Sequence, residues 1–172
     1  KVIPVDEEIV FSADEIIVSK TDLKGKLTYV NDVFCRVAEM QAKDVIGKPH
    51  NIIRHPHMPR TVFKLLWDTL QKGDELFAYV KNMSATGKYY WVIAHVTPSR
   101  GRDGNITGYH SNRRIPNPTY LPAVEKLYQE ILKEEESSAN PKLALEAGHN
   151  LLMRRVDEAA SNYDEYIWKM VA

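Results

Sequence analysis

Two prolines in three positions of the segment Ile115–Pro118 limit what this chain can fold into. Proline fixes φ and lacks a backbone N–H, so neither a strand nor a helix can run through the segment. Short alternating runs precede it, and long helical stripes follow it. The 172 residues are therefore expected to form an N-terminal segment over 1–11, a globular domain over 12–115 and a helical extension over 116–172.

Five short strands are expected before the proline segment, because runs of apolar and β-branched residues there are bounded by turn residues. They are Glu15–Lys20, Leu27–Val30, Leu76–Met83, Tyr89–Thr97 and Asn105–Arg114. Between the second and third strands, Asn31 can cap a helix that runs to about Met40, and Pro59 starts another that Gly73 ends. This order favours an α+β fold, in which an antiparallel five-stranded sheet carries short helices on one side.

After the proline segment the sequence predicts two amphipathic helices. The first covers Ala123–Glu135, and the second begins at Pro141 and carries apolar residues as far as Ile167. The acidic run Glu134–Glu136 is interpreted as a solvated helix end. The apolar stripe of each helix is too narrow for an isolated stable helix, so each must bury that stripe against another apolar surface. Packing on the chain's own domain and a dimer-forming or signal-transmitting bundle both remain open.

Composition narrows the class of function. The formal net charge is 0, which gives no electrostatic reason to expect nucleic acid or an anionic membrane as a partner. No apolar stretch approaches the roughly 20 residues that span a bilayer. The single cysteine, Cys35, favours a cytoplasmic location. No phosphate-binding loop, nucleophile elbow or carboxylate pair stands out, so an enzyme is not expected.

One segment carries a specific resemblance. Lys48–Pro59 reads KPHNIIRHPHMP and is similar to the signature loop of the flavin-binding PAS domains of bacterial aerotaxis and redox-taxis receptors. Further matching pieces follow the same order and spacing: Thr21-Asp22-Leu23, Asn31-Asp32, Trp67, Val80-Lys81-Asn82, Tyr90-Trp91-Val92 and Gly108-Tyr109. The resemblance covers roughly residues 12 to 115 and implies a PAS sensor domain.

The resemblance also implies a ligand and a role. In that family the sheet and the short helices form a cup that holds FAD, and the flavin redox state is the signal. The family pattern falls on Arg54, His55 and Met58 in the loop, and on Asn31, Trp67 and Asn82 elsewhere. Asn82 also resembles the asparagine of light-oxygen-voltage domains that bonds the flavin ring edge. A redox- or oxygen-linked sensory function in signal transduction follows.

Two positions depart from the family pattern. Leu76 stands where the family usually has a tryptophan, and His57 stands where it has an aspartate. Apolar bulk at Leu76 and Phe77 keeps open a ligand-free interaction module whose interior is filled by its own side chains. A haem-binding PAS sensor is a further alternative, with His55 or His57 as the axial ligand.

Metal binding by the cluster of His50, His55 and His57 is not expected, because no cysteine or second histidine cluster completes a ligand set.

The side chains of Trp91, Ile93 and His95 share one strand face, and those of Val92, Ala94 and Val96 share the other. The small apolar set is expected to face the cup, so the tryptophan face points outward and needs a cover. The segment Lys1–Phe11, the chain's own C-terminal helices or a second copy of the chain would each supply one. The apolar sheet face and the amphipathic tail together favour a homodimer. The sequence shows no recognisable output domain, so a separate signalling protein, or a domain outside this sequence, is expected to read the signal.

Overall fold

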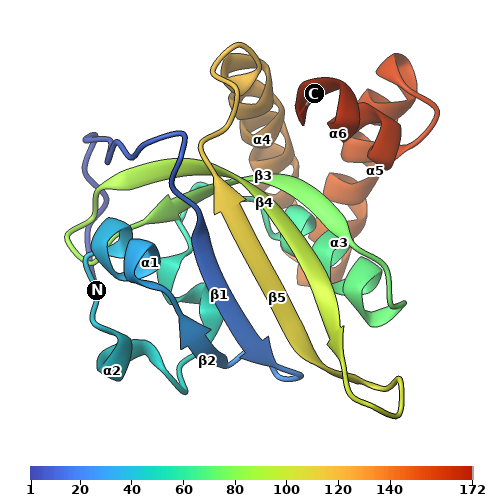
Figure 1. Ribbon diagram of the computed structural model, residues 1–172. Helices are drawn as coiled ribbons and strands as arrows, with labels where there is room; N and C mark the ends of the chain where they lie inside the picture. Colours follow the sequence, from blue (N-terminus) through green and yellow to red (C-terminus); the bar gives the residue numbers. More distant parts are fainter. Residues whose placement is uncertain (172) are drawn as a thin grey trace. The chain divides into compact units, whose positions relative to one another are not determined.

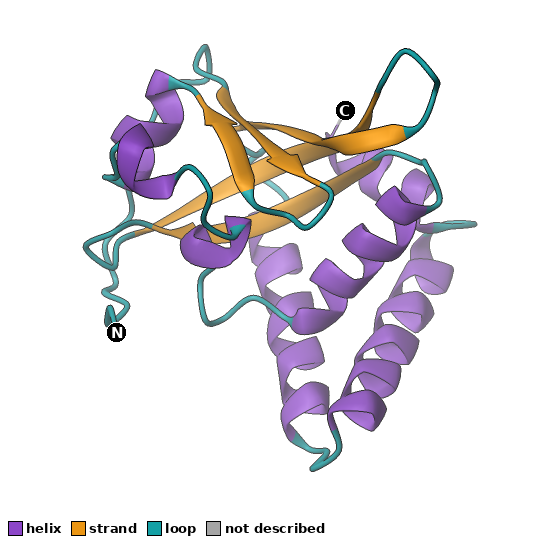
Figure 2. Ribbon diagram, turned by 90° about the horizontal axis from the view of Figure 1, so that it is seen from below, coloured by secondary structure: helices purple, strands orange, loops and turns teal. Residues whose placement is uncertain are grey.

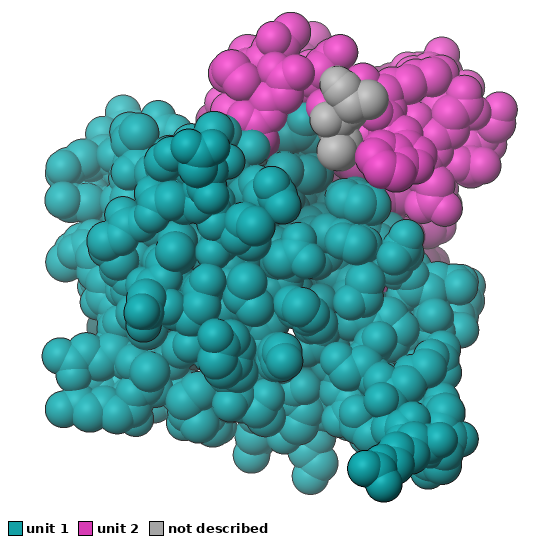
Figure 3. Space-filling view, viewed as in Figure 1, with its two compact units in different colours: residues 1–56, 69–115 teal, residues 57–68, 116–172 magenta. Residues whose placement is uncertain are grey.

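The computed structural model describes residues 1–171 and divides into two compact units (Figure 3). These are called here the sheet unit, residues 1–56 and 69–115, and the helical unit, residues 57–68 and 116–172. One boundary falls between Ile115 and Pro116, within the segment that the prolines interrupt. The helical unit also takes a stretch from the middle of the sequence, so its composition is not that of the C-terminal extension alone.

Five antiparallel strands form one sheet in the order β2-β1-β5-β4-β3 (Figure 1). The strands are β1 Ile17–Asp22, β2 Leu27–Val30, β3 Leu76–Met83, β4 Tyr89–Arg100 and β5 Ile106–Arg114. The expected α+β class and antiparallel five-stranded sheet are confirmed. β2 and β3 have the expected bounds, whereas β1 lies further along the chain than Glu15–Lys20.

The hairpin turns use left-handed glycines and aspartate caps. Gly25, between β1 and β2, has a φ of 79°, and Gly104, between β4 and β5, has a φ of 83°. Asp22 Oδ1 accepts from the backbone N–H of Lys26 at 3.0 Å, and Asp103 Oδ1 accepts from the N–H that follows Gly104 at 3.0 Å. Only glycine adopts such φ values without strain, so these turns fix the strand register.

Short helices lie against one face of the sheet, called here the inner face (Figures 1 and 2). They are α1 Asp32–Ala38, α2 Ala42–Val45 and the 3₁₀ helix η1 His50–Ile53. The strand residues of the inner face include Ile17, Ser19, Asn82, Tyr90, Val92, Ala94, Val96, Ser111 and Arg113. From α1, the Phe34 ring lies 5.5 Å from the Arg113 guanidinium, which places this helix on that face.

Side chains of both faces of β4 are buried. On the inner face Val92 is 0%, Ala94 4% and Val96 8% exposed, as expected for a small apolar wall. On the other face Trp91 is only 7% exposed in the single chain, while Ile93 and His95 are half-buried. A second copy is therefore not needed to bury Trp91, which removes one of the sequence-based reasons for a dimer.

The first residues of the chain pair with the beginning of β4. Tyr89 N donates to Glu7 O at 3.0 Å, and Ile9 N donates to Tyr89 O at 2.8 Å, in parallel register. β5 ends opposite Ile93, where Arg114 is its last paired residue, so the edge of β4 before Ile93 is free of β5. The N-terminal segment satisfies this edge, as buried or half-buried strand edges require.

The helical unit is built from long helices. α4 spans Leu121–Glu136, α5 spans Pro141–Ala159 and α6 spans Tyr163–Val171. Residues 60–68 of α3, Arg60–Gln71, also belong to this unit. α4 and α5 run antiparallel beside each other across a short loop (Figure 2). Their facing stripes bury Val124, Leu127, Ile131, Ala144, Leu151, Leu152 and Val156.

Two expectations for this part of the chain are corrected. The second tail helix is not continuous, because Ala160 is extended with a φ of −158°. Asn162 Oδ1 then accepts from Glu165 N at 2.8 Å, while Glu165 Oε2 accepts from Ser161 N at 2.9 Å, a reciprocal cap that starts α6. The acidic run is not wholly solvated either, since Glu135 is only 6% exposed.

Candidate functional site

A polar cluster lies on the inner face of the sheet unit. Arg113 Nη2 donates to Ser19 Oγ at 2.6 Å, and Arg113 Nη1 donates to His50 Nε2 at 3.1 Å. Ser19 Oγ lies 2.9 Å from the same imidazole nitrogen. The three residues come from β5, β1 and η1, so the cluster joins two neighbouring strands to the helix that covers them.

Arg113 is a buried cation without an acidic partner. Its side chain is 2% exposed, and among the described residues no carboxylate pairs with it. Burial lowers the pKa of Arg113 to about 10, with Tyr90 acting in the opposite direction, so the guanidinium stays charged at neutral pH. Within residues 1–171, its Nε has no hydrogen-bond partner. A buried charge in this state is costly, and its free N–H donor can take only an acceptor-rich or anionic group as a partner.

His50 is held neutral beside this cation. Burial, and then the charge of Arg113, lowers the pKa of His50 to about 3. Arginine has only donors, so Nε2 of His50 must be the acceptor and the ring proton resides on Nδ1. Protonation of Nε2 would place two donors against each other, which agrees with the direction of the pKa shift.

Asn82 supplies a second orphaned donor on the inner face. It lies opposite Tyr90 in the β3–β4 register and is 3% exposed, and no described residue forms a hydrogen bond with its Nδ2. Burial raises the pKa of Tyr90, with Arg113 lowering it, so the phenol stays protonated. Asn82 and Arg113 therefore present two unsatisfied N–H donors to the same side of the sheet. Native interiors rarely leave such donors unpaired.

The signature loop is attached to β3 at this asparagine. Arg54 forms an isolated antiparallel bridge with Asn82, and His55 N donates to Lys81 O at 3.4 Å. His55 is 2% exposed and Arg54 is half-buried. The structure thus brings together three of the residues singled out from the sequence, namely Arg54, His55 and Asn82.

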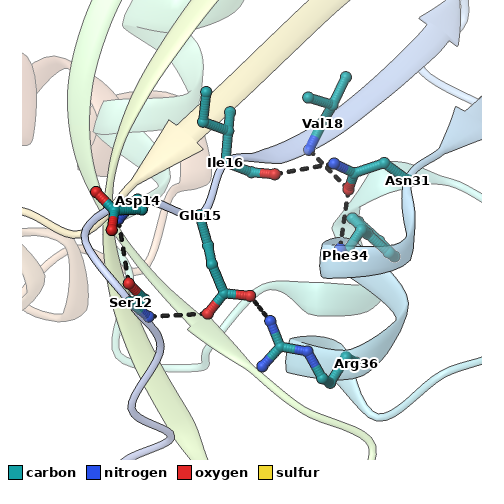
Figure 4. Close-up of polar contacts among 8 residues, drawn as sticks. All are labelled: Ser12, Asp14, Glu15, Ile16, Val18, Asn31, Phe34 and Arg36. Carbon is teal, nitrogen blue, oxygen red and sulfur yellow. Dashed lines mark hydrogen bonds and ion pairs between the residues drawn. The ribbon is translucent and has the colours of Figure 1, made fainter.

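Asn31 has a structural function that its sequence position partly indicates (Figure 4). Its Oδ1 accepts from Phe34 N at 2.9 Å, as the cap of α1, and from Val18 N at 3.0 Å. Its Nδ2 donates to Ile16 O at 2.8 Å. The amide thereby joins α1 to β1 and supports the inner face. A direct ligand contact by Asn31 stays a prediction.

Polar contacts also fix the residues that directly precede β1. Glu15 accepts from Ser12 N at 2.9 Å and forms an ion pair with Arg36 of α1, as Figure 4 shows. Arg36 is more than half exposed, so this pair contributes little free energy. It acts with Asn31 at the same junction of strand and helix.

Met58 and Trp67 belong to the helical unit, unlike the other predicted site residues. Met58 is 1% exposed, and Trp67 is half-buried in α3. Their contact with a ligand stays a prediction.

The cluster around Arg113 was not found from the sequence. The sequence pattern that could have revealed it is the alternation within β5, which places Tyr109, Ser111 and Arg113 on one face. An arginine at a position that alternation assigns to the interior is unusual, because charged side chains are rarely buried without a partner. His50 was noticed only as part of a histidine cluster.

The three histidines of the loop do not converge. His50 contacts Arg113, a cation, and His57 is exposed. Among the described residues, no group of three or more histidine, cysteine, aspartate or glutamate side chains is placed to hold a metal ion. In the part of the chain that the structure describes, no helix has both the length and the apolar character of a membrane span.

The strand order and the short helices on one face define an α+β domain of the PAS class. The PAS fold family matches residues 27–113, and the chain belongs to this family. The resemblance stated from the signature loop is therefore confirmed.

Two curated relatives share part of their sequence with the chain. It is 39% identical over 118 residues to the aerotaxis receptor of Escherichia coli strain K12, covering 69% of this chain and 23% of the receptor. It is 23% identical over 105 residues to a nitrogen fixation regulatory protein of Klebsiella pneumoniae, covering 61% of this chain and 21% of that protein. The chain thus spans less than a quarter of the length of these relatives.

Solved structures agree on the fold. A light-oxygen-voltage domain studied with a flavin analogue superposes with a TM-score of 0.56 at 16% identity, covering 67% of this chain and 86% of that one. The light-state structure of the blue-light photoreceptor Aureochrome1 gives a TM-score of 0.55 at 20% identity, covering 68% and 91%. At these identities the likeness shows the fold alone.

Proposed function

We propose that the chain is a redox- or oxygen-linked sensory PAS module that binds a flavin, FAD, on the inner face of the sheet unit. Its similarity to an aerotaxis receptor and the fold it shares with light-oxygen-voltage domains support this proposal. The observation that carries it is the pair of orphaned buried donors, Asn82 Nδ2 and Arg113 Nε, on one face.

These donors fit the chemistry of a flavin. The ring edge of a flavin carries carbonyl oxygens and nitrogens that accept hydrogen bonds, and a bound flavin supplies a reversible store of electrons. The amide of Asn82 can donate through Nδ2 and accept through Oδ1 at such an edge. Arg113 keeps a positive charge beside it at neutral pH, and such a charge favours a ligand state that carries more negative charge.

His50 and Ser19 would position the guanidinium. Each holds one of its terminal nitrogens, so the plane of the fork is fixed before a ligand arrives. Since His50 is neutral at physiological pH, it does not add a second charge that would compete for the same anion.

The signal would leave through the helical unit. We propose that a separate signalling protein reads it and that the chain acts as a homodimer, through α4 to α6 rather than through the Trp91 face. A non-enzymatic role and a cytoplasmic location stay predictions from the sequence.

The test is the absorption spectrum of the purified chain before and after incubation with FAD and removal of the excess. The expected result is the spectrum of oxidised flavin at one equivalent per chain. Asn82→Ala and Arg113→Gln should each weaken FAD binding by tenfold to about a hundredfold, since each removes a buried hydrogen bond. Asn112→Ala is the matched control, because Asn112 lies beside Arg113 but on the opposite face.

A haem spectrum would assign the haem-binding alternative, with His55 as the buried histidine of the loop. A colourless chain after incubation with both FAD and haem would support the ligand-free interaction module. Equal FAD affinity of the parent chain and both inner-face variants would contradict the assignment of the site.

A further inference from the structure

The first turn of α3 is capped by a carboxylate from a distant helix. Glu135 of α4 is 6% exposed, and its Oε1 accepts from Arg60 N at 2.9 Å. Its Oε2 accepts from Thr61 N at 3.1 Å and from Thr61 Oγ1 at 3.0 Å. The first N–H groups of a helix have no acceptor within the helix, so Glu135 takes the place of a local cap.

α5 approaches Thr61 and Glu135 closely at Gly148. A Cβ atom at Gly148 would lie 2.1 Å from Thr61 Oγ1, and 3.3 Å from both Glu135 Cγ and Ile131 Cγ2. Three helices therefore meet at one buried carboxylate. Arg60, Thr61, Glu135 and Gly148 are called here the Glu135 clamp.

The clamp lies a few residues along the chain from the candidate ligand site. Arg54 and His55 pair with the β3 backbone at Asn82 and Lys81. Only residues 56–59 separate this pairing from the first turn of α3, and prolines at both ends of that stretch restrict its φ angles. A displacement of Arg54 and His55 is therefore carried by a short, stiff link to the residues that the clamp holds.

We propose that the Glu135 clamp couples the inner-face site to α4 and α5. A shift of the loop at β3 either moves the clamp with the first turn of α3 or breaks it, and both outcomes change α4 and α5. Breaking the clamp would leave a buried carboxylate and two backbone donors unpaired, which is costly. We therefore expect the clamp to stay intact, so that α4 and α5 move with the first turn of α3. The identity of the stimulus rests on the proposed function, whereas the coupling is a property of the chain itself.

The test is a double-mutant cycle read by amide hydrogen exchange of the full chain without ligand. His55→Ala perturbs the loop by removing a buried side chain, and Glu135→Gln removes the charge and one acceptor of the clamp. Loss of a cap accelerates exchange in the first turn of α3 by about fivefold. His55→Ala should change exchange in residues 121–136 by at least threefold, and this change should vanish in the double variant.

Independent sites give multiplicative effects within about twofold, so a multiplicative cycle would overturn the proposal. Glu134→Gln is the matched control, since Glu134 is the exposed neighbour on α4. Thr61→Val, which removes the Oγ1 donor at similar volume, replaces Glu135→Gln if that variant does not fold.

Repeating the cycle with FAD separates this proposal from the proposed function. If FAD binds, it should alter exchange in β3 of every variant, and in α4 only where Glu135 is intact. An FAD-induced change in α4 that persists in Glu135→Gln would overturn the coupling. If FAD does not bind, the proposed function fails, while the ligand-free cycle still decides the coupling.

Discussion

Arg113 and Ser19 are joined by a hydrogen bond of 2.6 Å from Nη2 to Oγ, between neighbouring strands of the sheet. The register places Arg113 opposite Ile17 and Ser19 opposite Ser111, so the bond runs diagonally across β5 and β1. It fixes a guanidinium on an otherwise largely apolar face, with His50 as its second acceptor. A buried guanidinium without a carboxylate partner among the described residues lowers the stability of the folded chain, and the first prediction tests this.

Arg113→Met should stabilise the ligand-free chain and weaken FAD binding. Replacing a buried charge that lacks a carboxylate by an apolar side chain of similar length is expected to raise the free energy of unfolding by about 1–2 kcal/mol. FAD affinity should fall by tenfold or more. Urea unfolding and FAD titration measure the two quantities, with Asn112→Ala as control. A loss of stability in Arg113→Met would show that the charge is structurally compensated.

Acid should destabilise the chain through His50. The pKa of His50 is about 3 in the folded chain and 6.5 unfolded, so the unfolded state binds the extra proton between these values. Stability from this group is fully present above pH 6.5 and decreases by about 1.4 kcal/mol per pH unit as the pH falls towards 3.

Urea unfolding at several pH values between 7 and 4 measures this slope. His50→Gln is the matched variant, because its side-chain oxygen can accept from Arg113 but does not titrate. The same slope in both chains would assign the acid sensitivity to other groups.

Asn31→Ala should be strongly destabilising. The substitution removes the cap of α1 and leaves Val18 N and Ile16 O without their side-chain partner. A loss of about 2–4 kcal/mol in the free energy of unfolding is expected. Asn51→Ala, at an exposed position, should change the same quantity by less than about 0.5 kcal/mol. A similarly small effect in Asn31→Ala would mean that water replaces all three bonds.

Gly148→Ala should destabilise the chain although alanine is the better helix former. The added methyl group would overlap Thr61 Oγ1, which is expected to cost about 1–3 kcal/mol and to outweigh a propensity gain of about 1 kcal/mol. His149→Ala, at the next and exposed position of α5, is the control and should be neutral. Thermal unfolding compares the two, and a higher midpoint for Gly148→Ala would argue against the close approach.

The sheet could be predicted from local sequence because its signals are local. Turn residues bound β2 and β3, and alternation assigns Val92, Ala94 and Val96 to one buried face. The end of the last long helix could not be placed in this way, because the apolar stripe continues through Ala160. Asn162 and Glu165, which form the reciprocal cap of α6, are not part of that stripe, so the apolar pattern alone did not reveal the break.

The candidate site was only half visible in the sequence. Arg54, His55 and Asn82 stood out through their resemblance to a family, and the structure brings them together. Arg113 of this site, and Glu135 of the clamp, did not, because burial of a charged side chain depends on partners distant in sequence. Glu135 meets Thr61 across 74 residues, and Arg113 meets Ser19 across 94, separations that no local pattern encodes.

The pairing of Glu7 and Ile9 with Tyr89 has a consequence for the solution behaviour of shortened chains. A shortened chain that lacks residues 1–10 would expose the backbone donors and acceptors at the edge of β4, next to the large apolar ring of Trp91. Uncovered strand flanks recruit strands from other molecules. Self-association of such a fragment would then arise from the truncation itself and would not report a physiological assembly.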